Sequence, residues 1–402
     1  MSAGEVILDV SRLLSRARHQ TPSGVDRVEM AYARGLQARL GERLGFAAVH
    51  PFGNYGRLSR ARTLAFLDVT EARWASVEGK GAARPLSEVL PTLLNLLPTR
   101  PRPGPNSVYV QSSPHHLTKP DLVGRILAHE QARFLCFVHD LIPIEYPEYA
   151  RPDGARLHQR RVETITRFAD GVIVNSVSTA KSLTPWIAAS GRSIDVRVAL
   201  LGTENIPRGA PSPSPPPSTA ERPYFLCLGT IEPRKNHLLL LNLWRAMAQQ
   251  MDPAAIPRLV IVGRRGWENE QVVDMLERCP GLKDHVEELN GCSDARMHAL
   301  LRGARALLLP SFAEGYGMPV AEALSVGTPV ICSDLPALHE AGGAAPDFLD
   351  PLDGLGWEAC ILDHARGGPM YHAQLERMRG WHPPTWHDHI SILCDAIAAL
   401  QG

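Results

Sequence analysis

Residues 304–323, ARALLLPSFAEGYGMPVAEA, combine an apolar run with a glycine-rich turn and a short helical pattern. The run 304–310 has the length of a buried strand, and Pro319 suits the first turn of a helix, where its missing amide hydrogen is not needed. Gly315 and Gly317 allow a tight turn and a close approach of the backbone to a ligand. Amide groups at a helix start, with the positive end of the helix dipole, favour an anion. The stretch therefore predicts a strand, a turn and a helix that form an anion site.

Strand and helix patterns alternate along much of the chain. Continuous apolar strands separated by helices indicate parallel sheets covered on both faces. The strands expected from the sequence are 5–10, 133–139, 171–176, 224–229, 258–263, 304–310 and 328–333. The helices expected are 26–40, 155–169, 177–189, 236–250, 268–278, 318–326 and 336–342. We therefore predict an α/β protein with two doubly wound halves.

A proline-rich seam, PRGAPSPSPPPSTAERP at 207–223, separates the two halves. Proline fixes φ and donates no backbone hydrogen bond, so the seam can continue neither a helix nor a central strand. It predicts an N-terminal domain over 1–206 and a C-terminal domain over 224–383. The final amphipathic helix at 384–401 either closes the second domain or packs back on the first.

The composition excludes several classes of protein. The 402 residues include 42 Lys and Arg against 42 Asp and Glu, so no basic excess points to a nucleic-acid partner. The N-terminus lacks a secretory signal, and no apolar run is long enough to span a membrane. Seven scattered cysteines without a CxxC pair suit a reduced cytosol and the apolar core. We expect a cytoplasmic protein.

A second motif, GTIEPRKN at 229–236, also follows a predicted strand. Arg234 and Lys235 fall at a strand–helix junction, where doubly wound sheets bind ligands, and their charges suit a diphosphate. Glu314 lies in the glycine-rich turn, where it can bond sugar hydroxyls. Glu322 lies early in the following helix, where a carboxylate can hold ribose hydroxyls. A solvated loop and a favourable acidic first turn are the plain alternatives for each motif taken alone.

Together the two motifs resemble the family-four retaining glycosyltransferases, particularly the mannosyltransferase-like branch that carries GTIEPRKN. Segments in the order of that branch extend the likeness over most of 130–345: VHDLIPIEYPEY (138–149), VIVNSVSTA (172–180), the VG of IVGRRGW (261–267) and ELNGCSDARMHALLRGARALLLPS (288–311). The resemblance implies a GT-B fold, with two Rossmann-like domains facing a cleft and the donor nucleotide on the C-terminal domain.

The resemblance also implies roles for individual residues. Lys235 and Arg234 would bind the donor phosphates, Glu322 the ribose and Glu314 the transferred sugar. The catalytic set would be His139, Lys235 and Glu314. The remaining donor-binding positions would lie in the glycine-rich turns and at the nucleotide pocket: Gly24, Gly229, Gly263, Arg264, Gly315, Tyr316, Gly317 and Met318.

The N-terminal half carries fewer signals. His139 matches the family histidine that lies close to the donor sugar and the acceptor. Gly24 precedes a helix where the family often has two glycines, and it would let the donor phosphates approach. The arginine-rich stretch 11–22 is either an acceptor-recognition loop or a mobile one. The Leu-rich stretch 84–103 ends in basic residues; packing on its own domain is favoured over a peripheral contact with the inner membrane face.

The function implied is transfer of a hexose, with GDP-mannose favoured as donor, to a glycan or lipid-linked saccharide in polysaccharide biosynthesis. UDP- and dTDP-sugars, and a non-catalytic nucleotide-sugar-binding subunit, stay open. We expect no cofactor and no metal site, because no Asp-x-Asp ends a strand and no His/Cys cluster occurs. A dehydrogenase is disfavoured because no GxGxxG follows a strand.

Overall fold

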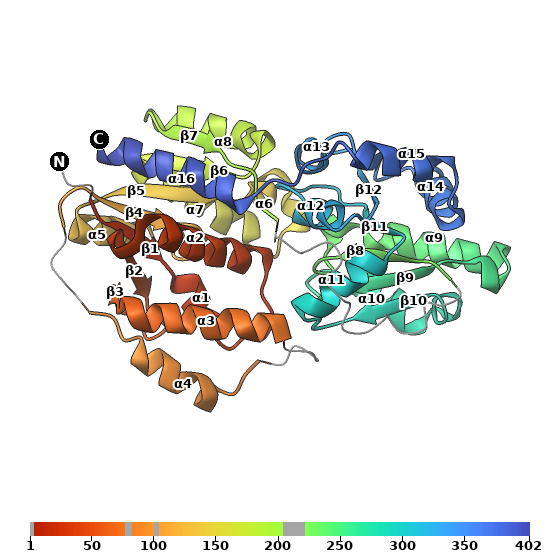
Figure 1. The fold of residues 1–402 in the computed structure, drawn as a ribbon, viewed down its shortest axis with the longest axis horizontal. Helices are drawn as coiled ribbons and strands as arrows, with labels where there is room; N and C mark the ends of the chain where they lie inside the picture. The colour runs from red at the N-terminus through yellow and green to blue at the C-terminus, as the bar shows by residue number, and fades with distance from the viewer. Residues whose placement is uncertain (1–3, 77–82, 100–103, 204–221) are drawn as a thin grey trace. The chain divides into compact units, whose positions relative to one another are not determined.

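The computed structural model describes residues 4–76, 83–99, 104–203 and 222–402 (Figure 1). The chain divides into two compact units: the first takes in Met1–Trp74, Gly81–Gly202 and Thr385–Gly402, and the second Ala75–Lys80 and Thr203–Pro384. Of the proline-rich seam 207–223, residues 207–221 lie outside the described part. Among the described residues, no helix is both long enough and apolar enough to cross a bilayer.

The first unit contains a seven-stranded sheet in the order β3-β2-β1-β4-β5-β6-β7. All neighbouring strands pair in parallel except β2 and β3, which are antiparallel. The strands are β1 (Val6–Asp9), β2 (Leu44–Val49), β3 (Tyr55–Leu58), β4 (Ser107–Gln111), β5 (Ala132–Val138), β6 (Gly171–Val174) and β7 (Asp195–Val198). Strands β1, β4 and β6 are buried along their whole length because helices cover both faces.

The helices of this unit are α1 (Ser11–Ser15), α2 (Gly24–Leu40), α3 (Arg60–Ser76), α4 (Leu86–Asn95), α5 (Pro120–Glu130), α6 (Ile142–Glu145), α7 (Gly154–Phe168), α8 (Val177–Ser190) and α16 (Trp386–Gln401). Helix α16 comes from the far end of the chain and packs against α2 (Figure 1). The contact is so close that a Cβ added at Gly35 would overlap Ile390. The C-terminal helix therefore belongs to the first unit.

The second unit contains a fully parallel six-stranded sheet in the order β10-β9-β8-β11-β12-β13. The strands are β8 (Tyr224–Leu228), β9 (Arg258–Val262), β10 (Val286–Leu289), β11 (Ala306–Leu309), β12 (Val330–Ser333) and β13 (Asp347–Leu349). The helices are α9 (His237–Gln250), α10 (Glu270–Arg278), α11 (Asp294–Gly303), α12 (Met318–Ser325), α13 (Pro336–Gly342), α14 (Gly354–Arg366) and α15 (Pro369–Met378). Trp244 and Trp357 are fully buried in its core.

The strands and helices expected from the sequence are present, with ends that differ by at most two residues. The stretch 11–22 differs from the expected loop, because Ser11–Ser15 form helix α1. Beyond it, Asp26 accepts from Arg12 Nε at 2.6 Å and from Arg16 Nε at 2.7 Å, and its carboxylate is buried. These ion pairs hold Arg12 and Arg16 at the start of α2, and the role of the stretch in acceptor recognition stays a prediction.

Each sheet reverses its winding between two central strands. In the first unit the order changes direction between β1 and β4, and in the second between β8 and β11. At such a switch point the loops after the two strands diverge, which opens a crevice at the carboxyl edge of the sheet. The two switch points are therefore where the fold itself favours binding sites.

Candidate active site

The two motifs of the C-terminal half meet at the switch point of the second unit. GTIEPRKN follows β8, and the turn 311–317 follows β11, the strand that pairs with β8. The Phe312 amide donates to the Arg234 carbonyl at 2.9 Å, which holds the two loops together. The parallel pairing thus brings side chains nearly 80 positions apart in the sequence to one edge.

Glu314 lies between the two predicted cations. Lys235 Nζ donates to Glu314 Oε1 at 2.6 Å, and Arg234 Nη1 donates to Oε2 at 2.8 Å. Ser311 Oγ also donates to Oε1, at 2.6 Å. Arg234 is held on its other side by Glu232, at 2.8 Å. The side chains of Lys235 and Glu314 are only 9% and 8% exposed. Because water cannot solvate them well, each charge is stabilised by the opposite charge of the other.

The charge state of Glu314 follows from these partners. Burial by itself would raise its pKa, but the charges of Arg234 and Lys235, with hydrogen bonds from Lys235 and Ser311, lower the pKa to about 2. The carboxylate is therefore ionised at every physiological pH. Both of its oxygens are engaged, so it is a weak base and a weak nucleophile in this arrangement.

Glycines keep the backbone beside this cluster free of side chains. Gly229 has φ of +136°, and Lys235 Cε would lie 3.3 Å from an added Cβ. A Cβ at Gly263 would overlap the carbonyl oxygen of Gly229. Gly317 has φ of +96° and caps α12. These positions need glycine for conformation and space, which is the physical basis of the glycine-rich pattern.

The remaining predicted donor positions surround the same edge of the sheet. Gly315 and Tyr316 lie in the turn before α12, and Met318 is the first residue of that helix. Glu322 follows one turn later, half-buried, and Tyr316 is buried. Arg264 is exposed after β9, and its carbonyl accepts the Ile231 amide at 2.9 Å. The motif residues therefore share one edge of the sheet.

His139 and Gly24 belong to the first unit. His139 follows β5, and its Nε2 lies 2.8 Å from the Ser112 carbonyl oxygen. A carbonyl only accepts, so Nε2 carries the ring proton and the Nδ1 lone pair is left as an acceptor. Burial lowers the pKa of His139 to about 4, which keeps the ring neutral near pH 7. Gly24 is exposed and begins α2, after the N-cap Ser23.

A polar cluster that the sequence analysis missed lies at the switch point of the first unit. Asp9 ends β1 and accepts from Tyr109 at 2.5 Å and from the Ser11 amide at 2.8 Å. Glu29 of α2 accepts from the Leu13 amide at 3.0 Å through Oε1. Burial and the neighbouring Asp9 charge raise the pKa of Glu29 to about 8. Two carboxyl groups are thus buried at this edge, and Glu29 holds a proton near neutral pH.

Several atoms beside these carboxyl groups complete no hydrogen bond within the described part of the chain. They are Glu29 Oε2, the hydroxyls of Ser112 and Ser113, and His116 Nε2, all buried. His116 also has a φ of +62°, a strained value for a residue with a side chain. Buried polar atoms without partners are costly unless water or a ligand satisfies them. No single motif contains this cluster, because its members come from a strand, a helix and a loop that are far apart in the sequence.

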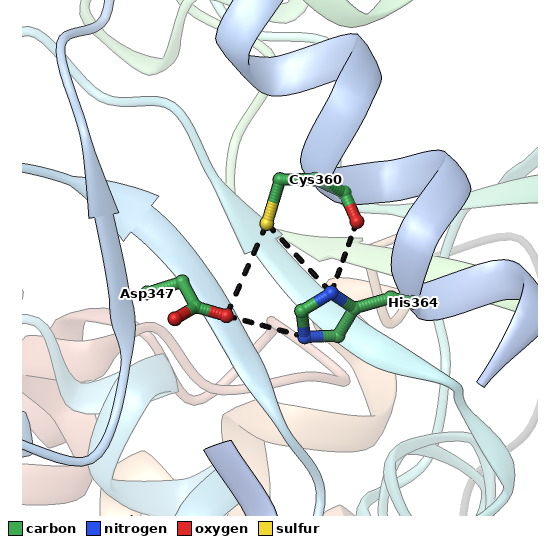
Figure 2. A group of neighbouring side chains, drawn as sticks. All are labelled: Asp347, Cys360 and His364. Carbon is green, nitrogen blue, oxygen red and sulfur yellow. Dashed lines mark hydrogen bonds and ion pairs between the residues drawn. The ribbon is translucent and has the colours of Figure 1, made fainter. Parts of the chain in front are cut away.

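Among the described residues, one group has the geometry to suggest a metal: Asp347, Cys360 and His364 (Figure 2). His364 Nδ1 faces the Cys360 carbonyl at 3.0 Å, and Nε2 faces Gln374 Oε1 at 3.1 Å and Asp347 at 3.3 Å. Burial raises the pKa of the Cys360 thiol, which disfavours the thiolate that a metal needs. Both ring nitrogens already have partners, so the group fits a network that fastens α14 to β13.

The C-terminal unit also matches a known family. Residues 213–343 match the family described as "Glycosyl transferases group 1". The chain is 31% identical over 240 residues to the "Serotype-specific mannosyltransferase WbdA" of Escherichia coli, a match that covers 55% of this chain and 28% of that protein. It is 30% identical over 233 residues to the "O-antigen chain mannosyltransferase B" of Escherichia coli, covering 56% and 60%.

The whole chain resembles solved structures of the same fold. Sucrose-phosphate synthase from Thermosynechococcus elongatus superimposes with a TM-score of 0.63 and 16% identity, covering 99% of each chain. This likeness and the two parallel-sheet units confirm the predicted GT-B fold. The matches support the glycosyltransferase group 1 family. The chain spans between 27% and 60% of the length of the first curated relatives it matches.

Proposed function

We propose that this chain is a retaining glycosyltransferase that transfers a hexose from a nucleotide sugar to a hydroxyl group. The observation that carries the proposal is the Arg234–Glu314–Lys235 cluster at the switch point of the second unit. A buried and a half-buried cation at the carboxyl edge of a parallel sheet suit a diphosphate, and their charges stabilise the charge that develops as the sugar–phosphate bond breaks.

Each predicted donor residue has a role in this proposal. Lys235 and Arg234 bind the two phosphates, and Glu322 holds the ribose hydroxyls from the second turn of α12. The amide groups of Gly315, Tyr316 and Gly317 donate to the sugar or the phosphates. Met318, Gly229, Gly263 and Arg264 complete the donor pocket. Glu314 bonds a hydroxyl of the transferred sugar and keeps the two cations in place.

Retention follows from chemistry on one face of the sugar. The acceptor oxygen forms its bond to the anomeric carbon on the face from which the phosphate oxygen leaves, and the departing phosphate takes the acceptor proton. The low pKa of Glu314 supports this route, because a carboxylate with that pKa and three hydrogen bonds is a poor covalent nucleophile. Arg234 and Lys235 supply the positive charge that a metal ion would supply in other transferases.

The first unit contributes the acceptor side in this proposal. Nδ1 of the neutral His139 ring accepts a hydrogen bond from a sugar hydroxyl. Gly24 lets the donor phosphates approach the start of α2. Asp9, Glu29, Ser113 and His116 then offer partners to acceptor hydroxyls. The unpartnered buried atoms at this switch point support the assignment, since hydroxyl groups can both donate and accept there.

The favoured donor is GDP-mannose, and the favoured acceptor is a glycan or a lipid-linked saccharide in polysaccharide biosynthesis. Support comes from the mannosyltransferase names of the two relatives, one of them an O-antigen chain enzyme. UDP- or dTDP-sugar donors remain the alternative, because the motif recognises ribose and phosphates rather than the base. We place the reaction in the cytoplasm, where nucleotide sugars are the donors.

A two-stage experiment tests the proposal. Thermal shift with GDP-, UDP- and dTDP-sugars identifies the donor, since a ligand at one hundred times its Kd adds about 2.7 kcal/mol to stability. Transfer to a mannan-type oligosaccharide is then followed by NMR, which reads the anomeric configuration of the product. An inverted product refutes retention. Binding without transfer or donor hydrolysis favours the alternative of a non-catalytic nucleotide-sugar-binding subunit.

A further inference from the structure

Asn175 follows β6, and its side chain reaches the loop that carries His139 after the neighbouring strand. Strands β5 and β6 pair in parallel with Val138 opposite Val174, so the residues that follow the two strands lie next to each other. Asn175 Nδ2 donates to the His139 carbonyl at 2.8 Å. Asn175 is only 3% exposed. A buried hydrogen bond therefore joins two strand ends at the backbone of His139.

The orientation of the Asn175 amide group follows from its partners. Thr179 Oγ1 donates to Asn175 Oδ1 at 3.0 Å, and Ser176 Oγ lies 3.4 Å from the same oxygen. A carbonyl oxygen only accepts hydrogen bonds, so the amide nitrogen, and not the amide oxygen, must face His139. A flipped amide would place two oxygen atoms against each other at 2.8 Å. The partners therefore determine which end of the amide meets the His139 loop.

The plain structural role at this place, capping of α8, belongs to Ser176 and not to Asn175. Ser176 is the N-cap of the helix, and its Oγ accepts from the Thr179 amide at 3.0 Å. The bond from Asn175 to His139 joins residues 36 positions apart, so it does not form a local turn either. The donor group of Asn175 is thus used on the backbone of His139.

Two further hydrogen bonds hold the same loop. Nε2 of His158, in α7, lies 3.0 Å from the Asp140 carbonyl oxygen, which only accepts, so His158 donates to it. The His139 ring donates from its own Nε2 to the Ser112 carbonyl at 2.8 Å. The backbone of residues 139 and 140 is thus held by Asn175 and His158, and the ring by Ser112. Together the three bonds fix where Nδ1 of His139 lies.

We propose that Asn175 is a positioning residue, which holds the His139 backbone so that Nδ1 of the ring meets the sugar hydroxyl. The inference rests on the role of His139 in the proposed function. A displacement of about 1 Å at a reacting group costs about a hundredfold in rate. Loss of one of the three bonds should therefore slow transfer by about tenfold or more. The affinity for the donor should stay unchanged, because the proposed phosphate and ribose contacts, Arg234, Lys235 and Glu322, belong to the second unit.

Single-turnover transfer by the full chain tests the proposal. Asn175→Leu keeps the shape of the side chain and removes the amide group, and we expect a rate about tenfold or more below that of the natural protein. Titration with the nucleoside diphosphate should show an unchanged affinity. Gln374→Met is the matched control, because Gln374 is also a buried amide that donates to a backbone carbonyl, that of Val330 in the second unit. If Asn175→Leu does not fold, Asn175→Ser takes its place, since its hydroxyl group is one bond too short to reach His139.

A double-mutant cycle and NMR separate positioning of the ring from a general effect on folding. In a His139→Ala background the ring is absent, so Asn175→Leu should lower the remaining rate by no more than about twofold. In protein labelled with ¹⁵N-histidine, the His139 signals, identified by their absence in His139→Ala, should show the ring proton on Nε2. Asn175→Leu should shift these signals, whereas Gln374→Met should leave them unchanged.

Three results would overturn the proposal. One is a loss of rate in Asn175→Leu no larger than in Gln374→Met. Another is the same loss of rate with and without the His139 ring. The third is a set of His139 ring signals that Asn175→Leu does not change. A chain that transfers no sugar from any donor would instead overturn the proposed function, and the ring signals alone would then decide whether Asn175 holds His139.

Discussion

Glu314 illustrates how one side chain is defined by its partners. The neighbouring residues in the sequence are compatible with either an exposed acid or a nucleophile. In the structure, three side chains donate hydrogen bonds to its two oxygens. Such a carboxylate acts as a fixed negative charge that positions the two cations, and in the proposed function it also bonds a sugar hydroxyl. Chemistry at this site therefore depends on the cations more than on the acid.

Lys235→Ala should lower transfer about a hundredfold. In the proposed function its ammonium group stabilises charge that develops in the transition state, where one lost contact costs ~3 kcal/mol. Arg234 and Ser311 still hold Glu314, so the fold should survive. Steady-state transfer rates measure the effect, and the exposed Lys283→Ala serves as the charge-matched control. Turnover close to that of the control would remove the phosphate role.

Glu322→Ala and Glu314→Gln should have different effects. A ribose contact exists both before and during reaction, so Glu322→Ala should weaken nucleoside diphosphate binding about tenfold or more. Glu314→Gln should slow transfer while binding the diphosphate as well or better, because Arg234 and Lys235 lose their compensating charge. Calorimetric titration and single-turnover rates separate the two. Unchanged affinity in Glu322→Ala would argue against the ribose role.

The raised pKa of Glu29 predicts that the free energy of unfolding depends on pH. Its pKa is raised from 4.5 to about 8, so between these values the folded chain binds one more proton than the unfolded chain. The free energy of unfolding therefore falls as pH rises through this window. Glu29→Gln keeps the acceptor for Leu13 and removes the titration, so its advantage in Tm over the natural protein should grow from pH 5 to pH 8. A Tm difference that stays constant with pH would show that Glu29 titrates normally.

At the scale of elements, the contact between α2 and α16 leaves no room for a side chain at Gly35. Gly35→Ala should destabilise this unit by ~1–2 kcal/mol, because the new Cβ overlaps Ile390 and overpacking outweighs the helix propensity gained. Ile390→Ala in the same chain should recover part of that loss. Thermal unfolding of both single variants and the double variant measures the coupling. Additive effects would mean that the two residues do not touch.

The network of Asp347, Cys360 and His364 shows how an element contact can imitate a metal site. Asp347 comes from β13, and the other two residues come from successive turns of α14. Gln374 of α15 extends the network by donating to the Val330 carbonyl of β12. Four elements are joined by groups that all have hydrogen-bond partners. Polar side chains buried in this way contribute to specific packing rather than to catalysis.

At the scale of the whole molecule, transfer should survive excess EDTA. In the proposed function Arg234 and Lys235 provide the charge that the leaving diphosphate needs, and the atoms of the Asp347 network already have partners. The initial rate with and without chelator is the measurement, after prior dialysis. A rate that falls with EDTA and returns with magnesium or manganese would refute the metal-free mechanism.

Much of the fold was predictable because the apolar runs and the helical periodicity of the sequence indicate which strands and helix faces are buried. Strands such as Tyr224–Leu228 are buried on both faces and read as continuous apolar runs, and the glycines at 229 and 317 report backbone conformations that only glycine adopts easily. Six strands were missed: β2, β3, β4, β7, β10 and β13. The antiparallel pair β2 and β3 breaks the alternation of strand and helix, and the edge strands β7, β10 and β13 are only partly buried, so they lack a continuous apolar run.

The sequence alone thus determined the α/β class, the two halves and the residue types beside the donor motifs, since each is encoded within one strand and its following turn. Only the tertiary structure decided which distant segments meet. It joined Glu314 to Lys235, packed α16 on α2, and gathered Asp9, Glu29 and His116 at one edge. Periodicity tells which face of an element is buried, but strand order and register decide what that face contacts.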